Sequence, residues 1–176
     1  MGIKVPQIYF ADKIQGRSVP VQERIPGVGL NVAWRYLPAQ EKMAFRCQAR
    51  KLLKALCAVQ GKGSSYVVAN PDPVANRGIQ TLERDILFAN CGEGNGGAAR
   101  HGICALLHND LSQSNLIVRD GKIVAVVDWE MAGFFTWGVV REVHLRIRSP
   151  SKETCAHLNL PQNVLDDIYF WSDLYE

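Results

Sequence analysis

The chain has 176 residues, of which 47% are hydrophobic and 21% are charged, and its formal net charge is +3. This length and composition are ordinary for a globular protein with a single core, so we expect one domain over residues 1–176. So small a net charge gives no indication of the dense basic patches that bind nucleic acids, which argues against a nucleic-acid partner.

No targeting or membrane segment is evident in the sequence. Lys4, Pro6, Asp12 and Lys13 interrupt the N-terminal residues, which therefore lack the apolar core of a signal peptide. No run approaches the ~18 apolar residues of a membrane span, so we expect no membrane partner. The five cysteines are irregularly spaced, a pattern typical of reduced thiols, and the sequence predicts a cytoplasmic protein.

The N-terminal part of the chain is predicted to be a β-hairpin. Residues 8–11 and 18–25 would form its two strands, and the chain would turn near residues 15–16. Pro20 cannot donate a hydrogen bond to a neighbouring strand, which favours an edge position for the second strand.

Residues 40–59 form the clearest predicted helix. Apolar residues recur along one face of it with helical spacing: Phe45, Ala49, Leu52, Leu53 and Leu56. A second face carries a basic residue at every fourth position: Lys42, Arg46, Arg50 and Lys54. We interpret this basic row as a solvated helix face rather than a surface for an anionic partner.

Residues 92–97 match the phosphate-binding pattern Gly-x-Gly-x-x-Gly. Such a loop binds phosphate when a strand precedes it and a helix follows. Here residues 81–91 are predicted to be helical and residues 102–107 to be a strand, so the order is reversed. We therefore interpret the segment as a flexible connection.

The most informative residues are His108, Asp110, Asn115 and Asp128. Their order is that of kinase-type phosphoryl-transfer sites, in which a base for the acceptor hydroxyl precedes two oxygen ligands for magnesium. Residues 116–119 and 122–127 are predicted to pair through a two-residue turn at Asp120-Gly121.

With that turn, Asn115 would face Val126. The period of two would then place Asp128 on the same face of the hairpin as Asn115. An amide oxygen and a carboxylate would thus lie together, and both are hard ligands suited to Mg²⁺. Beyond the hairpin, residues 139–148 and 162–171 predict two further helices.

The pattern His-x-Asp-x-x-x-x-Asn, a hairpin and Val-Val-Asp-Trp-Glu resembles the aminoglycoside phosphotransferase and choline kinase-like family, whose members are related to protein kinases. Residues 21–27 are similar to the family's hinge segment, which contacts adenine. The resemblance implies an α+β, protein-kinase-like fold. Residues 1–27 would be the end of the small lobe and the hinge, and residues 28–176 would be the mainly helical large lobe.

The same resemblance implies an enzyme that transfers the γ-phosphoryl group of ATP to a hydroxyl of a small molecule, with Mg²⁺ and ATP as cofactor and co-substrate. Each role is carried by a matching position of this sequence. The resemblance implies Asp110 as the catalytic base, His108 as a support for the catalytic loop, Asn115 and Asp128 as magnesium ligands, Gln22, Glu23 and Arg24 as the adenine-binding segment, and Glu130 as a supporting residue.

Asn109 occupies a position where the family usually has Gly and protein kinases have Arg, which weakens the protein-kinase interpretation more than the small-molecule one. Two further departures from the family leave an alternative open. Lys4 and Lys13 lack the Val-Ala-Ile-Lys context of a phosphate-gripping lysine. Roughly twenty residues precede Gln22, too few for the usual small lobe of about three strands and a helix. The chain could instead be a non-catalytic, truncated remnant or a nucleotide- or partner-binding module, with the missing lobe supplied by upstream sequence or another chain.

Overall fold

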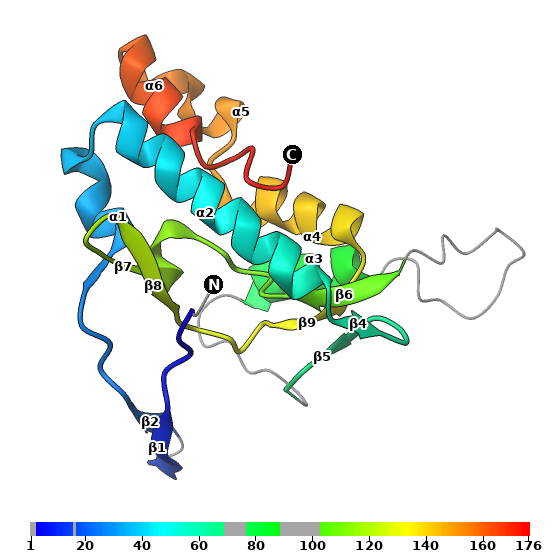
Figure 1. Ribbon diagram of the computed structural model, residues 1–176. Coiled ribbons are helices and arrows are strands. Elements are labelled where there is room, and N and C mark those ends of the chain that lie inside the picture. Colours follow the sequence, from blue (N-terminus) through cyan, green and yellow to red (C-terminus); the bar gives the residue numbers. More distant parts are fainter. Residues whose placement is uncertain (1–2, 16, 69–76, 89–102) are drawn as a thin grey trace, which may run out of the picture. The chain divides into compact units, whose positions relative to one another are not determined.

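The computed structural model of the chain describes residues 3–15, 17–68, 77–88 and 103–176 (Figure 1). Contacts between its Cα atoms divide the chain into two compact units. The first unit comprises residues 1–48 and 111–128, and the second comprises residues 49–110 and 129–176. The predicted lobe boundary at residue 27 stays a prediction, and the Gly-rich segment 92–97 lies outside the described residues.

The first unit begins with the predicted hairpin. Strands β1 (Ile8–Ile14) and β2 (Arg17–Gln22) pair antiparallel and form a two-stranded sheet. Gln15 has φ of 51°, in the left-handed region that such tight turns use. The hairpin ends at Gln22, so the strand leads directly into the predicted hinge segment.

A second sheet of the first unit has the order β3-β7-β8. It consists of β3 (Val28–Gly29), β7 (Leu116–Arg119) and β8 (Lys122–Val126), all antiparallel. The predicted turn between β7 and β8 is confirmed, because Asp120 and Gly121 both have positive φ, 51° and 70°. This hairpin carries the predicted magnesium ligands at its open end.

Gly27 allows the hinge segment to run close to β7. A Cβ atom at this position would lie 2.7 Å from Ile117 Cγ2 and 2.8 Å from the Val118 carbonyl oxygen. The backbone φ of 152° also lies in a region that side chains rarely adopt. Any larger residue would therefore push the hinge away from the strand that precedes the turn.

The helix predicted over residues 40–59 is α2 (Ala39–Cys57), which follows the short helix α1 (Leu30–Ala33) and the 3₁₀ turn Trp34–Tyr36. Its predicted apolar face is largely confirmed, with four buried side chains: Phe45, Ala49, Leu52 and Leu53. Each such burial stabilises the fold by roughly 1 to 3 kcal/mol.

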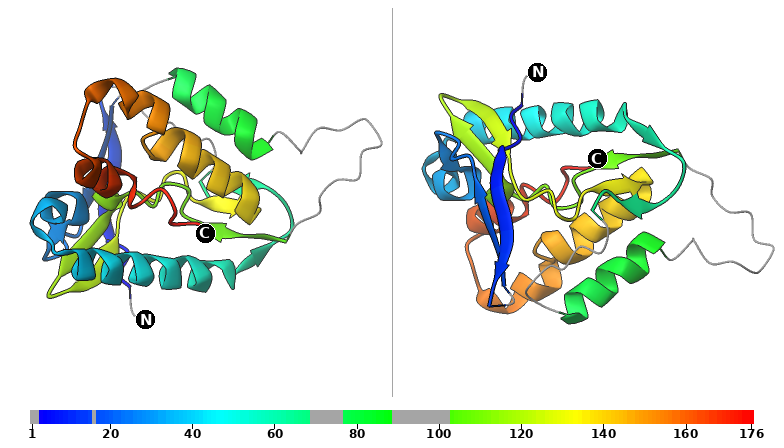
Figure 2. Two further views of the ribbon diagram at one scale, coloured as in Figure 1. Left: turned by 90° about the horizontal axis from the view of Figure 1, so that it is seen from above. Right: turned by 90° about the horizontal axis from the view of Figure 1, so that it is seen from below.

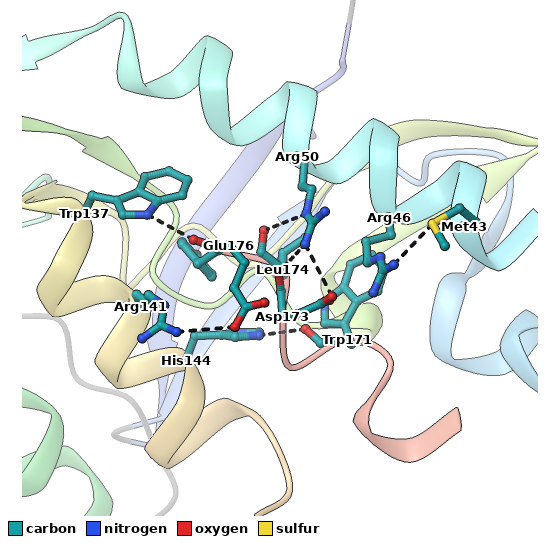
Figure 3. Close-up of polar contacts among 11 residues, drawn as sticks. Met43, Arg46, Arg50, Trp137, Arg141, His144, Trp171, Asp173, Leu174 and Glu176 are labelled. Atoms are coloured by element: carbon teal, nitrogen blue, oxygen red, sulfur yellow. Dashed lines mark hydrogen bonds and ion pairs between the residues drawn. The ribbon is translucent and has the colours of Figure 1, made fainter. Parts of the chain in front are cut away.

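The expectation of a solvated basic row on α2 is correct only in part. Lys54 is exposed, but the ammonium of Lys42 lies 5.2 Å from the centre of the Trp34 ring. Arg50 donates to the backbone oxygens of Asp173 and Leu174 at 2.5 and 3.3 Å (Figure 3). A long basic side chain can bury its aliphatic part against the protein while its charged group binds a specific partner. The spacing of basic residues along the helix does not predict that partner.

The second unit contains a sheet of order β4-β6-β9-β5. Its strands are β4 (Gln60–Gly61), β5 (Ser65–Tyr66), β6 (Cys104–Leu107) and β9 (Gly133–Phe135), all antiparallel. The strand predicted over residues 102–107 is thus confirmed from Cys104 onward. It is central in the sheet and mostly buried, and His108 directly follows its last residue.

The remaining helices belong to the second unit: α3 (Arg77–Phe88), α4 (Trp137–Val143), α5 (Lys152–Cys155), the 3₁₀ turn Ala156–Leu158 and α6 (Gln162–Tyr169). α4 continues through a wider helical turn over His144–Arg148, so the helix predicted for residues 139–148 is confirmed with an earlier start. The helix predicted for residues 162–171 is confirmed as far as Tyr169. α3 and α4 lie side by side (Figure 2).

The C-terminal segment after α6 packs into the second unit. Leu174 and Tyr175 are almost completely buried. The Trp137 indole donates to the Tyr175 backbone oxygen at 3.1 Å, and Arg141 pairs with Glu176 (Figure 3). Among the described residues, no helix has the length and apolar content needed to cross a membrane.

Candidate functional site

Asn115 and Asp128 both lie at the open end of the β7–β8 hairpin in the first unit. The predicted register is wrong by one residue, because a bulge between Ile117 and Val118 pairs Leu116 with Val126. Asn115 therefore stands opposite Val127, whose N–H donates to the Asn115 backbone oxygen at 3.0 Å. A bulge places an extra residue in one strand, and turn chemistry at the other end of the hairpin does not reveal it.

Asp128 follows the end of β8 and does not continue its alternation. Its φ of 63° is left-handed, so the period-two argument for its side chain does not apply. The Asn115 side chain is largely buried and Asp128 is exposed. An amide oxygen and an exposed carboxylate at one hairpin end fit Mg²⁺, which is usually held by one or two protein ligands together with phosphate oxygens.

This donor set is small. The described residues contain no group of three or more His, Cys, Asp or Glu side chains that could hold a metal by themselves.

The predicted hinge lies in the same unit and is tied to the same hairpin. The Glu23 N–H donates to the Gln7 carbonyl oxygen at 2.7 Å, and the Glu23 carboxylate pairs with the Lys4 ammonium. That hydrogen bond from Lys4 holds the pKa of Glu23 below its ordinary value. Lys4 in turn hydrogen-bonds through its backbone to Val124 and Val126 of β8, both at 3.1 Å.

Gln22 and Arg24 flank Glu23. Gln22 ends β2 and is paired with Ile8, while Arg24 is exposed. Through Lys4, the segment containing these residues is connected to β8 within two residues of Asp128. The first unit thus brings the predicted adenine-binding segment and the predicted metal ligands into one connected structure.

The second unit carries His108, Asp110 and Glu130. His108 is fully buried, and its ring packs edge-on against Trp129, with the ring centres 4.7 Å apart. Asp110, two residues after His108, is partly exposed. Glu130 is exposed in the turn closed by a hydrogen bond from the Ala132 N–H to the Trp129 oxygen at 3.0 Å.

Asn109, between His108 and Asp110, adopts a left-handed backbone with φ of 63°. Gly and Asn are the residues that tolerate this region best, so the backbone at this position suits either residue. Unlike Gly, Asn109 also has a side chain that can bond. Its amide donates to Glu83 Oε1 at 2.7 Å, and both side chains are almost completely buried.

Glu83 lies on α3 and is the centre of a charged network. Its second oxygen, Oε2, accepts from Arg148 Nη2 at 2.6 Å. Arg148 Nε lies 3.5 Å from Asp110 Oδ1. Burial raises the pKa of Glu83, the guanidinium of Arg148 opposes that rise, and the charge of Asp110 adds to it.

Sequence reasoning missed both Glu83 and Arg148. A signal was present in α3, because Glu83 shares the buried face with Ile86 and Leu87 at spacings of three and four. A glutamate at a core-facing helix position indicates a paired buried charge. Its partner could not be found in the same way, since it lies 65 positions away in the sequence.

His144, one turn before Arg148, is buried and serves the packing of the C-terminal segment. Its Nε2 lies 3.0 Å from the Trp171 carbonyl oxygen and 3.1 Å from Ser149 Oγ (Figure 3). Because a carbonyl only accepts, Nε2 carries the proton and donates to it. Burial lowers the pKa of His144, and the Trp171 carbonyl opposes that effect.

We therefore predict that His144 makes stability depend on pH. Its folded pKa lies below the ordinary value of 6.5, so its contribution is present above that value and is lost as the pH falls through the folded pKa. Urea unfolding measured from about pH 7 to about pH 5 should show a loss of stability that is smaller in His144→Gln. His157→Gln, at an exposed position, is the matched control. Identical pH curves for the wild type and His144→Gln would contradict the assignment.

Comparisons with known proteins give one family match and several similar folds. Residues 103–136 match the profile of the phosphotransferase enzyme family. No curated protein matches the sequence. The chain is similar to the aminoglycoside phosphotransferase APH(2'')-IIa in its ternary complex with streptomycin and ATP, with 16% identity, coverage of 98% of this chain and 68% of that chain, and a TM-score of 0.50.

Two further solved structures are similar. The apo form of a thermostable mutant of the aminoglycoside phosphotransferase APH(4)-Ia has 16% identity, coverage of 99% and 76%, and a TM-score of 0.46. The macrolide 2'-phosphotransferase MphH from Brachybacterium faecium has 18% identity, coverage of 94% and 59%, and a TM-score of 0.45. The likeness to APH(2'')-IIa confirms the predicted kinase-like fold class.

Proposed function

We propose that the chain transfers the γ-phosphoryl group of ATP to a hydroxyl of a small molecule. Residues 103–136 match the model of the phosphotransferase enzyme family, and the fold is similar to that of an aminoglycoside phosphotransferase. The observation that carries the proposal is the conjunction in the first unit. Asn115 and Asp128 share one hairpin end, and Lys4 connects that hairpin to the hinge segment. This conjunction supports a nucleotide and metal site.

The roles of the residues follow from their chemistry. Asn115 and Asp128 would hold Mg²⁺, which when bound neutralises charge on the phosphates. Backbone groups of residues 22–24 would meet adenine. Asp110, which is partly exposed, would accept or orient the proton of the acceptor hydroxyl. The buried His108 would hold the catalytic loop in place.

The acceptor class is a hydroxylated small molecule. The structure of APH(2'')-IIa is a complex with streptomycin and ATP, so polyhydroxylated compounds of this kind are the first probes for the present chain. Glu130, exposed in the turn after Asp128, is proposed to support the metal side of the site, because a second carboxylate there adds to the negative field that favours a cation.

The metal pair makes a direct prediction. Asp128→Ala should weaken Mg-ATP binding more than about 100-fold, because even residues that only orient metal ligands are worth about 10- to 100-fold. Binding is measured as thermal stabilisation on titration with Mg-ATP. Asp120→Ala on the turn of the same hairpin and Ser112→Ala should bind like the wild type. Equal binding by Asp128→Ala and the wild type would remove the metal assignment.

A nucleotide-binding module without turnover is the second candidate. It is favoured by the N-terminal sequence, because Lys4 and Lys13 lack the Val-Ala-Ile-Lys context of a phosphate-gripping lysine. The Mg-ATP titration, combined with an ATP-consumption assay on pooled hydroxylated acceptors, distinguishes the enzyme from the nucleotide-binding module. Tight Mg-ATP binding without consumption would favour the module, while consumption that vanishes in Asp110→Asn would favour the enzyme.

A further inference from the structure

We propose that Arg148 is a positioning residue for Asp110, and that the buried Glu83 fixes Arg148 for this purpose. The inference rests on the proposed function, in which Asp110 is the catalytic base. It adds to the site a pair of residues, on α3 and at the end of the helical segment after α4, that no motif of the sequence indicated.

The carboxylate of Glu83 is held in a fixed position. Its carboxylate is only 2% exposed and uses both of its oxygens: Oε1 accepts from the Asn109 amide at 2.7 Å, and Oε2 accepts from Arg148 Nη2 at 2.6 Å. A carboxylate bound on both oxygens inside the protein has little freedom to rotate. Glu83 therefore serves as a rigid anchor for both of its partners.

The guanidinium of Arg148 lies between two carboxylates, those of Glu83 and Asp110. Arg148 reaches Glu83 through Nη2 and Asp110 through Nε, which lies 3.5 Å from Oδ1. These two nitrogens belong to one rigid plane, so fixing one of them directs the other. Because Glu83 holds Nη2, the guanidinium of Arg148 places its positive charge beside Oδ1 of Asp110.

The residue before Asp110 is also held by Glu83. Asn109 has a left-handed φ of 63°, and its side chain is bound to the same carboxylate that binds Arg148. Asp110 is thus tied to Glu83 along two routes, one through the peptide bond from Asn109 and one through Arg148. Two routes restrict the position of the Asp110 carboxylate more than either does alone.

Arg148 contacts Glu83 and Asp110 through two different nitrogens, and this allows a test of whether it positions Asp110 or only compensates the charge of Glu83. Arg148→Lys keeps a positive charge for the buried Glu83 but has only one nitrogen, which cannot be bound to Glu83 and directed at Asp110 through a rigid plane. Arg146→Lys, at an exposed position two residues earlier that pairs with Glu142 at 2.9 Å, is the matched control.

The experiment measures turnover with Mg-ATP and streptomycin or pooled hydroxylated acceptors, thermal stability, and amide hydrogen exchange of residues 108–112 in the full chain. For Arg148→Lys we expect a kcat lowered about 10- to 100-fold, the effect of misplacing a reacting group by about an ångström. KM for ATP and thermal stability should stay close to wild type, and exchange of residues 108–112 should quicken. Arg146→Lys should match the wild type in every measurement.

Failure of the positioning role can be distinguished from failure of the proposed function. If the wild type turns over and Arg148→Lys has the same kcat as Arg146→Lys, the positioning role is overturned. If kcat falls only in proportion to a loss of folded protein, Arg148 is structural and the proposal is again overturned. If the wild type shows no turnover that depends on Asp110, the proposed function fails, and the catalytic part of the inference fails with it. Amide hydrogen exchange of residues 108–112 then tests only whether Arg148 holds this loop in position. Unchanged exchange in Arg148→Lys would overturn the positioning of the loop as well.

Discussion

Replacing Asp110 by asparagine is expected to lower the rate of phosphoryl transfer about 10²- to 10⁴-fold, the usual contribution of a positioned acid or base. Asparagine has nearly the same shape but cannot accept the proton of the acceptor hydroxyl. Because Asp110 is partly exposed and its ion pair with Arg148 spans 3.5 Å, the variant should remain folded.

Initial rates of ATP consumption with a saturating acceptor measure this effect. Asp120→Asn is the matched control, since Asp120 is an exposed carboxylate in the turn of the β7–β8 hairpin whose left-handed φ of 51° suits Asn as well. Mg-ATP binding should be unchanged in both variants. A rate for Asp110→Asn that equals that of Asp120→Asn would rule Asp110 out as the base.

Replacing Arg148 by methionine should give the largest effect on folding, a loss of about 3 to 5 kcal/mol in the free energy of unfolding at neutral pH. The change leaves the carboxylate of Glu83, which is 2% exposed, without its cationic partner. Arg146→Met removes an ion pair of two half-exposed side chains and should change the stability by no more than about 1 kcal/mol.

The loss in Arg148→Met should also depend on pH. The folded pKa of Glu83 lies above the ordinary value of 4.5, and without Arg148 it rises further. Such a group contributes stability that is fully present below 4.5 and is lost as the pH rises through the folded pKa. The deficit relative to the wild type, measured by urea unfolding, should therefore shrink on acidification. A deficit that grows on acidification would contradict the buried-pair interpretation.

The fold was predictable where local chemistry decides the structure. Asp120-Gly121 determined the turn between β7 and β8, and the apolar spacing of residues 40–59 determined α2 and most of its buried face. The register of the hairpin was not predictable, because the bulge after Ile117 depends on how the strands pack and leaves no mark in the turn. The short strands β3, β4, β5 and β9 were missed because two or three residues carry no periodic signal.

The motif residues of the candidate site were predictable from the sequence, but the network around Asp110 was not. The motif residues were found because their spacing within the loop and hairpin is local, whereas the network around Asp110 joins α3, the loop and Arg148 across the sequence. Long-range ion pairs have no spacing rule, so sequence reasoning left Arg148 without a role. Similarly, it assigned Arg50 to solvent, although Arg50 binds the C-terminal segment.

The central claim is that the chain transfers a phosphoryl group to a small-molecule hydroxyl and uses Asp110 to do so. It is tested most directly by incubating the chain with Mg-ATP and pooled hydroxylated acceptors, streptomycin included, and by following the acceptor masses. We predict an acceptor heavier by one phosphoryl group, formed at a rate below the ~1 to 100 per second of typical kinases, and absent with Asp110→Asn or Asp128→Ala. ATP hydrolysis without any phosphorylated acceptor, or an identical product yield from Asp110→Asn, would contradict the account.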